Sequence, residues 1–414
     1  MKSQIPTIAR FVILFCILSF ANCKLLVAQT PITLKAAIDT ALKNNLLVKN
    51  EQLKAQYQQL LINTAGAIPK TMVLADAGQF NSIYTDTKIG IAQTFSMPKV
   101  YASQKDLLQQ EWKSSLLNVS VREALLKRQV AQLFYMILYV EQKKGLLQNV
   151  DSLYAAFYKK AALRLVKGES NILEKASAET QLGQINIQLN QLKQDMEILQ
   201  LQFQLLLNTT TYFIPENKMY QNELSGYGDT VSLKKNAVLQ LIQQQQNIAA
   251  ATIQLEKSKL LPDWTLGYNN TSIRGTGADN KIYSSGSRFS SIQVGVGIPI
   301  FSKAQKVKIN SAQFAQQLAE SNYAVGLQSL KTEYEVAIAQ YRKQMETVQY
   351  FETTALKNAA LITTTANQQL ANGNINYLQW VQVINQATIV KNDYVEAVKN
   401  LNQSIIELNY FTNQ

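Results

Sequence analysis

Side chains that commonly carry out catalysis are scarce in this sequence. Histidine is absent from all 414 residues, which removes the commonest general base and the commonest transition-metal ligand. The only two cysteines, Cys16 and Cys23, lie close to the N-terminus. Carboxylates are scattered along apparent helix faces, where a solvated helix surface is the simpler interpretation. We therefore expect no catalytic residue, no cofactor, no metal site and no enzymatic activity.

Residues 1–29 have the pattern of a secretory signal peptide. Lys2 and Arg10 provide a positive start, and residues 11–20 form an apolar run too short to span a bilayer as a retained anchor. Cleavage near Ala28 would remove both cysteines. A lipidated Cys23 is the alternative, but the residues before it match a lipoprotein signal poorly.

The sequence is basic, with a formal net charge of +12. Its Lys and Arg residues are spread through long helical stretches and form no basic block interleaved with aromatic residues, so we expect no nucleic-acid partner. After residue 29, no apolar run approaches the roughly 18 residues that a membrane helix needs. A membrane-crossing part of this chain would therefore consist of β-strands.

The chain contains an internal repeat with an offset of 205 residues. Gly168 follows Phe95 at the same spacing as Gly373 follows Ile300, and Pro69 and Pro262 each separate a helical stretch from a strand-like one. Residues 30–230 predict a helix, a β-hairpin at about 70–96, a long helix at about 100–167, a helix at about 170–206 and a linker. Residues 231–414 predict a helix, a hairpin at about 263–300, a long helix at about 304–371 and a helix at about 374–411.

The predicted strands alternate between apolar and small or polar residues, as half-buried strands do. In the second hairpin, two strands flank a polar loop at residues 275–286, and in the first hairpin Val73, Ala75 and Ala77 face Ile89 and Ile91. Four strands of about ten residues have the length of membrane strands. Taken alone, they fit a soluble hairpin packed on helices equally well. The expected membrane face of the second hairpin comprises Trp264, Leu266, Tyr268, Ile292, Val294, Val296 and Ile298.

The helices predict coiled-coil seams rather than the side of a globular core. From 100 to 167 there is no proline, and apolar residues follow the steps of three, four and seven that are typical of a coiled coil: Leu126, Val130, Leu133, Ile137, Val140, Leu147, Tyr154, Phe157 and Ala161. A second helix can fold back on the first through Leu173, Leu182, Ile185, Leu189, Leu192, Met196 and Leu199. Gly168 and Gly373 are then the turns of two helical hairpins.

These features resemble the TolC family of outer-membrane efflux proteins. The resemblance rests on residues 34–45 in the first helix, the strand starts at Pro69 and Pro262, the strand end at 295–301, and the glycines at the two turns. It extends over residues 30–414. The amino-acid sequences of residues 151–154 and 168–175 resemble those of family members that serve heavy-metal efflux pumps of the resistance-nodulation-division type.

The resemblance implies a mainly α fold with membrane β-strands. Each chain would contribute long coiled-coil hairpins and four β-strands to a trimer that forms a 12-stranded β-barrel and a periplasmic α-barrel. Three chains of four strands could close, whereas four strands alone could not. The implied function is a passive duct from periplasm to exterior, carrying metal ions or small toxic compounds. Its partners would be a periplasmic adaptor, an inner-membrane pump of the same type and outer-membrane lipid.

The resemblance also suggests a periplasmic gate and docking sites. Family members are often narrowed by acidic residues six and nine positions after the second tip glycine, where this chain has Gln379 and Gln382. Glu174, six residues after Gly168, is the carboxylate that could take their place, although a solvated first-turn residue is an equally good interpretation. Adaptor docking is expected at the tips, at Lys167, Gly168, Asn372 and Gly373.

Two other classes of protein remain open at this stage. A periplasmic adaptor or scaffold also has long helical hairpins, but usually a single one, whereas this chain has two complete repeats. An enzyme fits less well, because the sequence lacks histidine and shows no phosphate-binding loop or carboxylate cluster.

Overall fold

The computed structural model describes residues 30–80, 83–216, 221 and 230–412. The predicted signal peptide, including Cys23, lies outside the described residues. Contacts divide the chain into two compact units, which are described separately. The first, the hairpin unit, comprises the described residues within Met1–Asn45, Leu126–Ser225 and Ala339–Glu407. The second, the sheet unit, comprises the described residues within Leu46–Leu125, Gly226–Ile338 and Leu408–Gln414.

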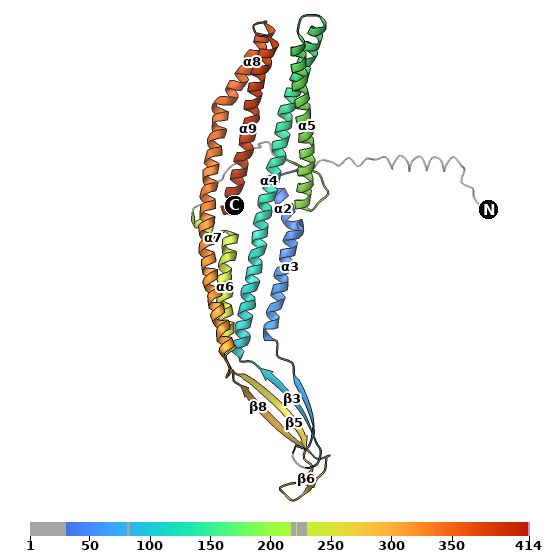
Figure 1. The fold of residues 1–414 in the computed structure, drawn as a ribbon, viewed down its shortest axis with the longest axis vertical. Coiled ribbons are helices and arrows are strands. Elements are labelled where there is room, and N and C mark those ends of the chain that lie inside the picture. Colours follow the sequence, from blue (N-terminus) through green and yellow to red (C-terminus); the bar gives the residue numbers. More distant parts are fainter. Residues whose placement is uncertain (1–29, 81–82, 217–220, 222–229, 413–414) are drawn as a thin grey trace, which may run out of the picture. The chain divides into compact units, whose positions relative to one another are not determined.

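The hairpin unit is built from two helical hairpins (Figure 1). One joins the 69-residue α4 (Pro98–Val166) to α5 (Ile172–Leu207), and the other joins α8 (Leu356–Ala371) to α9 (Tyr377–Thr412). Helix α2 (Leu34–Asn44) and a parallel pair of short strands, β1 (Thr30–Ile32) and β4 (Phe213–Pro215), complete the unit. The Thr33 hydroxyl caps α2 by accepting from Ala36 N–H.

Burial along α4 follows the predicted coiled-coil spacing. Eight of the nine seam residues are buried, and Leu133 is half-buried. In α5 the agreement is partial, because Leu173 is 64% exposed. It lies in the first turn of the helix, and the buried seam of α5 begins only at Ala178. The prediction of Leu173 as a seam residue is therefore wrong.

Polar contacts and aromatic rings join α4 to α9 within the hairpin unit. Tyr139 Oη donates to Glu396 Oε2 at 2.6 Å, and Lys399 forms an ion pair with the same carboxylate. Further along, Arg128 Nη1 lies 3.2 Å from Glu407 Oε2. Because these contacts link elements more than 250 positions apart, they fix the two hairpins against each other.

The long second-repeat helix contains an interruption that the sequence did not indicate. It runs as α7 (Lys303–Tyr350), a π-helical turn η3 (Phe351–Ala355) and then α8. At the π-turn, Glu352 accepts a hydrogen bond from Tyr394 Oη at 3.0 Å. A π-turn inserts an extra residue and rotates the face that follows, so the seam of α8 is offset from that of α7.

The sheet unit carries one antiparallel sheet in the order β2-β3-β5-β8. Its strands are β2 (Met72–Gly78), β3 (Asp86–Phe95), β5 (Asp263–Ser272) and β8 (Arg288–Gly297). Strand β8 ends before Ile298 and Ile300, which the sequence had placed in it, because Pro299 has no N–H to continue the ladder. A small hairpin, β6 (Gly275–Thr276) and β7 (Ile282–Tyr283), occupies the polar loop.

Helices lead into and out of this sheet. Helix α3 (Leu46–Leu61) and the short η1 (Ile62–Gly66) precede β2, α4 follows β3, α6 (Ala237–Ser258) precedes β5 and α7 follows β8. The short η2 (Thr230–Lys235) comes before α6. Asn236 caps α6 by accepting from Val238 N–H at 3.0 Å.

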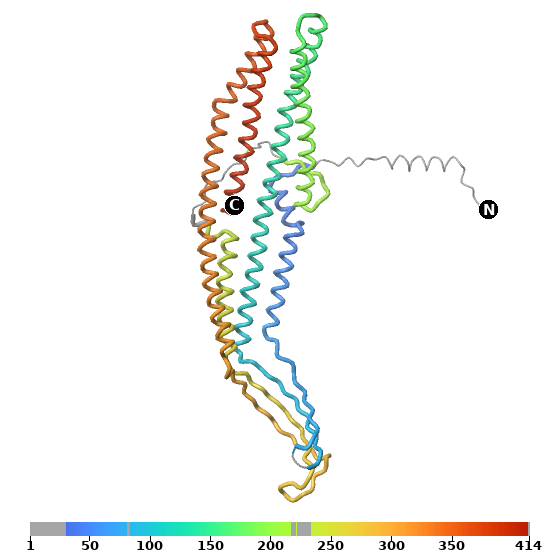
Figure 2. The backbone as a smooth tube through the Cα atoms, in the orientation of Figure 1, coloured from blue at the N-terminus to red at the C-terminus, as the bar shows by residue number. Residues whose placement is uncertain are grey.

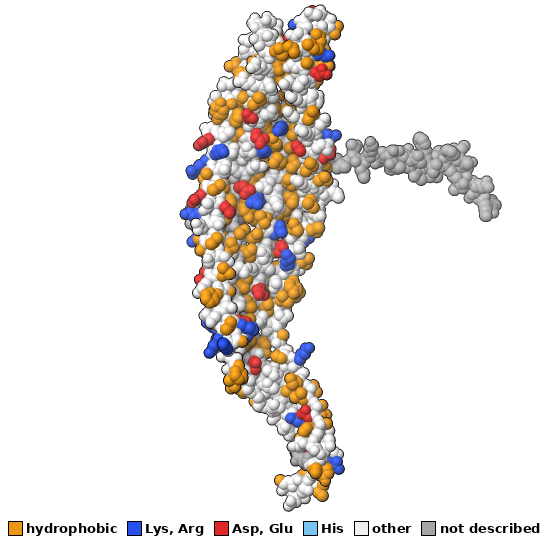
Figure 3. All heavy atoms as spheres, in the orientation of Figure 1, with side chains coloured by type: hydrophobic (Ala, Val, Ile, Leu, Met, Phe, Trp, Pro, Cys, Tyr) orange, Lys and Arg blue, Asp and Glu red, His pale blue; other side chains and the backbone are white. Residues whose placement is uncertain are grey.

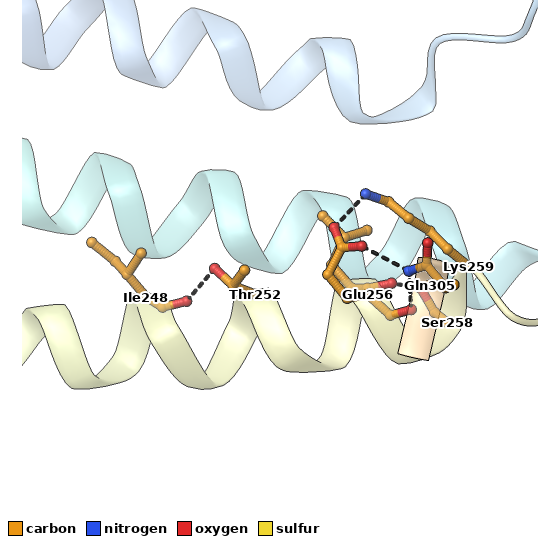
Figure 4. A network of polar contacts seen from close by, with 7 residues as sticks. Ile248, Thr252, Glu256, Ser258, Lys259 and Gln305 are labelled. Atoms are coloured by element: carbon orange, nitrogen blue, oxygen red, sulfur yellow. Dashed lines mark hydrogen bonds and ion pairs between the residues drawn. The ribbon is translucent and has the colours of Figure 1, made fainter. Parts of the chain in front are cut away.

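The ends of α6 and α7 that face the sheet are tied together (Figure 4). The Gln305 amide donates to the Glu256 carbonyl at 2.8 Å and to its carboxylate at 2.7 Å, and Lys259 Nζ lies 2.5 Å from the same carboxylate. Burial raises the pKa of Glu256, but the hydrogen bonds from Lys259 and Gln305 outweigh it and lower the pKa overall. These contacts hold the C-terminal end of α6, which precedes β5, against the N-terminal end of α7, which follows β8.

Candidate functional site

One face of the sheet is apolar and open to its surroundings. Opposed residues share a face, so Val73, Ile91, Tyr268 and Ile292 form a rung across all four strands. The neighbouring rungs add Leu266 with Val294 and Trp264 with Val296. We call this surface the apolar face. The residues predicted for it, including Ile298 beyond the strand end, are between 45% and 83% exposed. Orange side chains are visible over the strands in Figure 3.

The opposite face of the sheet is built mainly from small and polar residues. Thr94 and Thr265 hydroxyls lie 2.9 Å apart, and the Asn269 amide donates to Gln293 Oε1 at 3.2 Å. A Cβ at Gly90 would lie 2.5 Å from Asn269 Oδ1, so a larger residue at this position would displace the Asn269 amide. The sheet thus presents an apolar surface on one side and a hydrogen-bonding surface on the other. This asymmetry suits a wall between lipid and water.

The two predicted tip glycines occupy identical turns, seen as tight bends between α4 and α5 and between α8 and α9 (Figure 2). Gly168 has φ +72° and Gly373 has φ +76°. The N–H after each glycine bonds a carbonyl five residues back, Glu169 to Arg164 at 2.8 Å and Asn374 to Gln369 at 2.9 Å. These are Schellman motifs, whose left-handed residue is usually glycine. Lys167 and Asn372 precede the glycines and are exposed.

The helices that leave these turns also begin alike. Asn171 Oδ1 accepts from Glu174 N–H at 3.1 Å, and Asn376 Oδ1 accepts from Gln379 N–H at 2.9 Å. Gln379 Oε1 in turn accepts from Asn376 N–H at 2.9 Å, which completes a capping box. The first predicted gate position of the second repeat therefore has a local structural role. Gln379 and Gln382 are both exposed.

Glu174 has a different environment from the two glutamines. Its carboxylate lies 3.5 Å from Arg164 Nη1 and accepts a short hydrogen bond from Ser170, and its side chain is only 13% exposed. Glu174 also lines a groove of about 730 Å³ between the two hairpins, which neither described glutamine lines. An ion-paired carboxylate in a groove contributes less field to an aperture than an unpaired one. The three predicted gate residues are therefore not equivalent in one chain.

Arg164 and an aromatic group complete this groove, although the sequence predicted Phe157 only as a coiled-coil seam residue and assigned no site role to Arg164 or Tyr377. The rings of Phe157 and Tyr377 stack at 4.4 Å, and Trp380 donates from its indole N–H to Asn367 Oδ1 at 2.9 Å. The Arg164 guanidinium lies 5.4 Å from the centre of the Tyr377 ring. Burial raises the pKa of Tyr377, with Arg164 acting against this rise and Glu174 adding to it. Their positions in the sequence could have indicated these two residues, because Arg164 and Tyr377 each lie four residues from a tip glycine.

In the described part of the chain, no helix combines the length and apolar character needed to cross a membrane.

Comparisons with known proteins agree with this geometry. Residues 231–414 match the family model described as outer membrane efflux protein. Among solved structures, the chain is similar to CusC, studied for conformational changes in folding and transmembrane channel formation, at 15% identity and a TM-score of 0.76 over 93% of each chain. The CmeC outer membrane channel of Campylobacter jejuni has 13% identity and a TM-score of 0.75, covering 92% of this chain and 85% of its own.

The open state of the MtrE outer membrane channel of Neisseria gonorrhoeae is also similar, at 16% identity and a TM-score of 0.74 over 92% of this chain and 88% of that one. A search of curated proteins found no match. The fold is therefore that of the TolC-type outer-membrane channels. The family match covers residues 231–414, the second repeat, and this part of the chain is an outer membrane efflux protein domain. That family is one of transport proteins rather than enzymes.

Proposed function

We propose that this chain is the outer-membrane duct of a tripartite efflux system, through which substrates pass passively from the periplasm to the exterior. The observation that carries the proposal is the exposed apolar face on a sheet whose other face is polar, joined to long helical hairpins. Lipid would cover the apolar face and water the polar one. An inner-membrane pump of the resistance-nodulation-division type would supply the energy. The cargo would be metal ions or small toxic compounds.

The working assembly is a homotrimer. Among the described strands, β2 and β8 are the two edges of the sheet, and each pairs with only one neighbour. Unpaired backbone groups are costly in lipid. Pairing β8 of one copy with β2 of the next would satisfy them, and three copies would close a 12-stranded β-barrel. The helices would continue the duct as an α-barrel in the periplasm.

The turns at Gly168 and Gly373 are the docking tips for a periplasmic adaptor. They are exposed, and the residues beside the first tip are apolar: Val166 is 85% exposed and Ile172 60%. Exposed apolar residues of this size beside a turn favour a protein contact. Photocrosslinkers at Lys167 or Asn372 should capture the adaptor in intact cells. Labelling of these positions by reagents confined to the cell exterior would contradict this orientation.

The gate is formed near the same tips by Glu174, Gln379 and Gln382 from each of the three copies. Glu174 is paired with Arg164, and the glutamines are neutral. The aperture therefore lacks a ring of unpaired carboxylates, and we expect weak cation selectivity.

Reconstitution tests the proposed duct directly. The mature protein should form channels in planar bilayers and migrate as a trimer after mild detergent extraction. A periplasmic adaptor, the alternative class, would remain soluble without detergent and would not conduct. A water-soluble monomer with no conductance would therefore contradict the duct, and ATP- or substrate-turnover by the purified chain would contradict its passive character.

A further inference from the structure

On β5 and β8 the apolar face stops short of the loop end of the sheet, which is the end remote from the helices, whereas on β3 Ile89 continues it for one more rung. Its last complete apolar rung contains Tyr268 and Ile292, whereas the next pairs Asn270 with Ser290 and the one after pairs Ser272 with Arg288. Tyr268 lies at the boundary, and its hydroxyl is 2.7 Å from the Ser290 hydroxyl. A tyrosine with its ring among apolar residues and its hydroxyl among polar ones is typical of the border between lipid tails and headgroups.

Arg288 is fixed in place at this border. Its Nε donates to Asn270 Oδ1 at 2.5 Å, Nη2 to the Asn270 carbonyl at 3.0 Å, and Nη1 to Thr87 Oγ1 at 2.7 Å and, more weakly, to the Thr87 carbonyl at 3.4 Å. The guanidinium thus connects β8, β5 and β3. None of these partners is a carboxylate, and the side chain is exposed. A full positive charge is held at a fixed position beside the apolar face, without an acidic group among its hydrogen-bond partners.

A second arginine lies at the same end of the sheet. Ser272 on β5 is paired with Arg288, and Arg274 lies two residues beyond Ser272. The Arg274 guanidinium lies 4.7 Å from the centre of the Tyr84 ring. Its backbone N–H donates to Asp86 Oδ1 at 2.9 Å, and Ser272 Oγ donates to the same oxygen. Asp86 is fully buried, whereas both arginines are exposed. The exposed charged groups among these residues are therefore the two arginines.

We propose that Arg288 and Arg274 form a binding site for the phosphate groups of lipid headgroups in the outer leaflet of the outer membrane. The site rests on the proposed function, because that function places the apolar face in lipid and the loop end outside. Arginine recognises phosphate through charge-assisted hydrogen bonds, and a pre-positioned guanidinium loses less freedom when it binds. The bound headgroup would fix the depth of the sheet in the membrane.

Lipid retention by the full-length mature protein tests the site. The protein is reconstituted in phosphatidylcholine nanodiscs that contain lipid A, and the lipid retained after release is measured by native mass spectrometry. We expect Arg288→Gln to weaken lipid A retention about tenfold, the scale of one lost charge-assisted hydrogen bond. Dephosphorylated lipid A should be retained no better by the wild type than by the variant. Arg274→Gln should also weaken retention, while its backbone bond to Asp86 remains.

Lys281→Gln is the matched control, because Lys281 is a highly exposed cation in the β6–β7 hairpin that already faces Asp279 at 3.6 Å. Its retention of lipid A should equal that of the wild type. Unchanged retention in both arginine variants, or an equal loss in the lysine control, would overturn the site. If Arg288→Gln does not fold, the retention of lipid A by Arg274→Gln decides whether the site exists. Conductance separates the two proposals: a conducting wild type without phosphate-dependent retention refutes only the lipid site, whereas a non-conducting one refutes the duct.

Discussion

At the scale of single residues, the glycines provide a controlled test of backbone strain. Gly168 and Gly373 have positive φ, and a Cβ at either would meet nothing within 4 Å. Gly145, in the middle of α4, also has open space but sits in regular helix. Gly373→Ala should therefore destabilise the hairpin unit by about 1 kcal/mol, and Gly145→Ala should stabilise it by about 0.5–1 kcal/mol.

Thermal or denaturant unfolding of the purified variants measures this difference. Gly373→Asn should lose less than Gly373→Ala, because asparagine tolerates the left-handed region better. Equal effects of alanine at positions 145 and 373 would show that the turn conformation contributes nothing to stability.

The gate can be tested at the same scale. Gln379→Glu keeps an oxygen that can accept from Asn376 N–H, so the capping box and the helix start should survive while three carboxylates are added to the proposed trimer. We expect cation preference to rise and divalent cations to block the channel. Glu174→Gln should change selectivity less, because Arg164 already neutralises that carboxylate. Reversal potentials in asymmetric salt provide the measurement.

The two gate variants also distinguish where the aperture lies. A larger effect from Glu174→Gln than from Gln379→Glu would place the constriction on the first hairpin. No change in either variant, with channels still forming, would show that other residues build it.

At the scale of elements, the contact between α4 and α9 should make the hairpin unit sensitive to acid. Burial raises the pKa of Glu396, but the hydrogen bonds from Lys399 and Tyr139 and the charges of Lys399 and Lys143 outweigh it, so the pKa is lowered overall. A carboxyl whose folded pKa is lowered stabilises the fold above its ordinary pKa, and this contribution is lost as the pH falls through the folded value. Because Glu396 is 44% exposed, solvent limits the effect to about 1 kcal/mol or less.

We therefore expect the wild-type melting temperature to fall more steeply than that of Glu396→Gln when the pH is lowered from 6 into the range below the ordinary glutamate value of 4.5. Glu335→Gln is the control, because Glu335 and Lys331 are 3.9 Å apart and both highly exposed. Parallel pH profiles for the wild type and Glu396→Gln would contradict a stabilising role for this contact.

At the scale of the whole molecule, the strand order makes a prediction about assembly. Strands β2 and β8 are the outer strands of the sheet, so a cysteine on each should be joined between copies rather than within one. Ala75→Cys on β2 is combined in turn with Ile292→Cys, Val294→Cys and Val296→Cys on β8. The native cysteines both lie in residues 1–29. At least one pair should yield a covalent trimer on oxidation.

Denaturing gel electrophoresis with and without reductant measures this product. Each single-cysteine variant is the control. It should give no covalent trimer, because a link between copies needs one cysteine on β2 and another on β8. Linkage within one chain, seen as a shifted monomer, would contradict the edge-to-edge arrangement.

Much of this fold follows from local patterns in the sequence. The alternation in residues 292–296 and the heptad-like spacing from Leu126 to Ala161 both depend on backbone geometry that repeats every two or 3.5 residues, so they can be read without a structure. The glycines at 168 and 373 are equally local, because the left-handed turn that ends a helix favours this residue type. The 205-residue repeat then extends each local inference to the second half.

Tertiary structure alone decided how these elements meet. The sequence predicted two hairpins, and the pairing of β3 with β5 joins them into one sheet through contacts such as Thr94 with Thr265, which are 171 residues apart. The tertiary structure also places Arg164 between Glu174 and the Tyr377 ring, and it leaves Leu173 exposed near the first tip glycine. Such contacts depend on which distant surfaces fit together, and neither local propensity nor periodicity encodes that choice. The sequence therefore determined the kinds of surface that the chain carries, and the long-range packing determined which side chains meet on them.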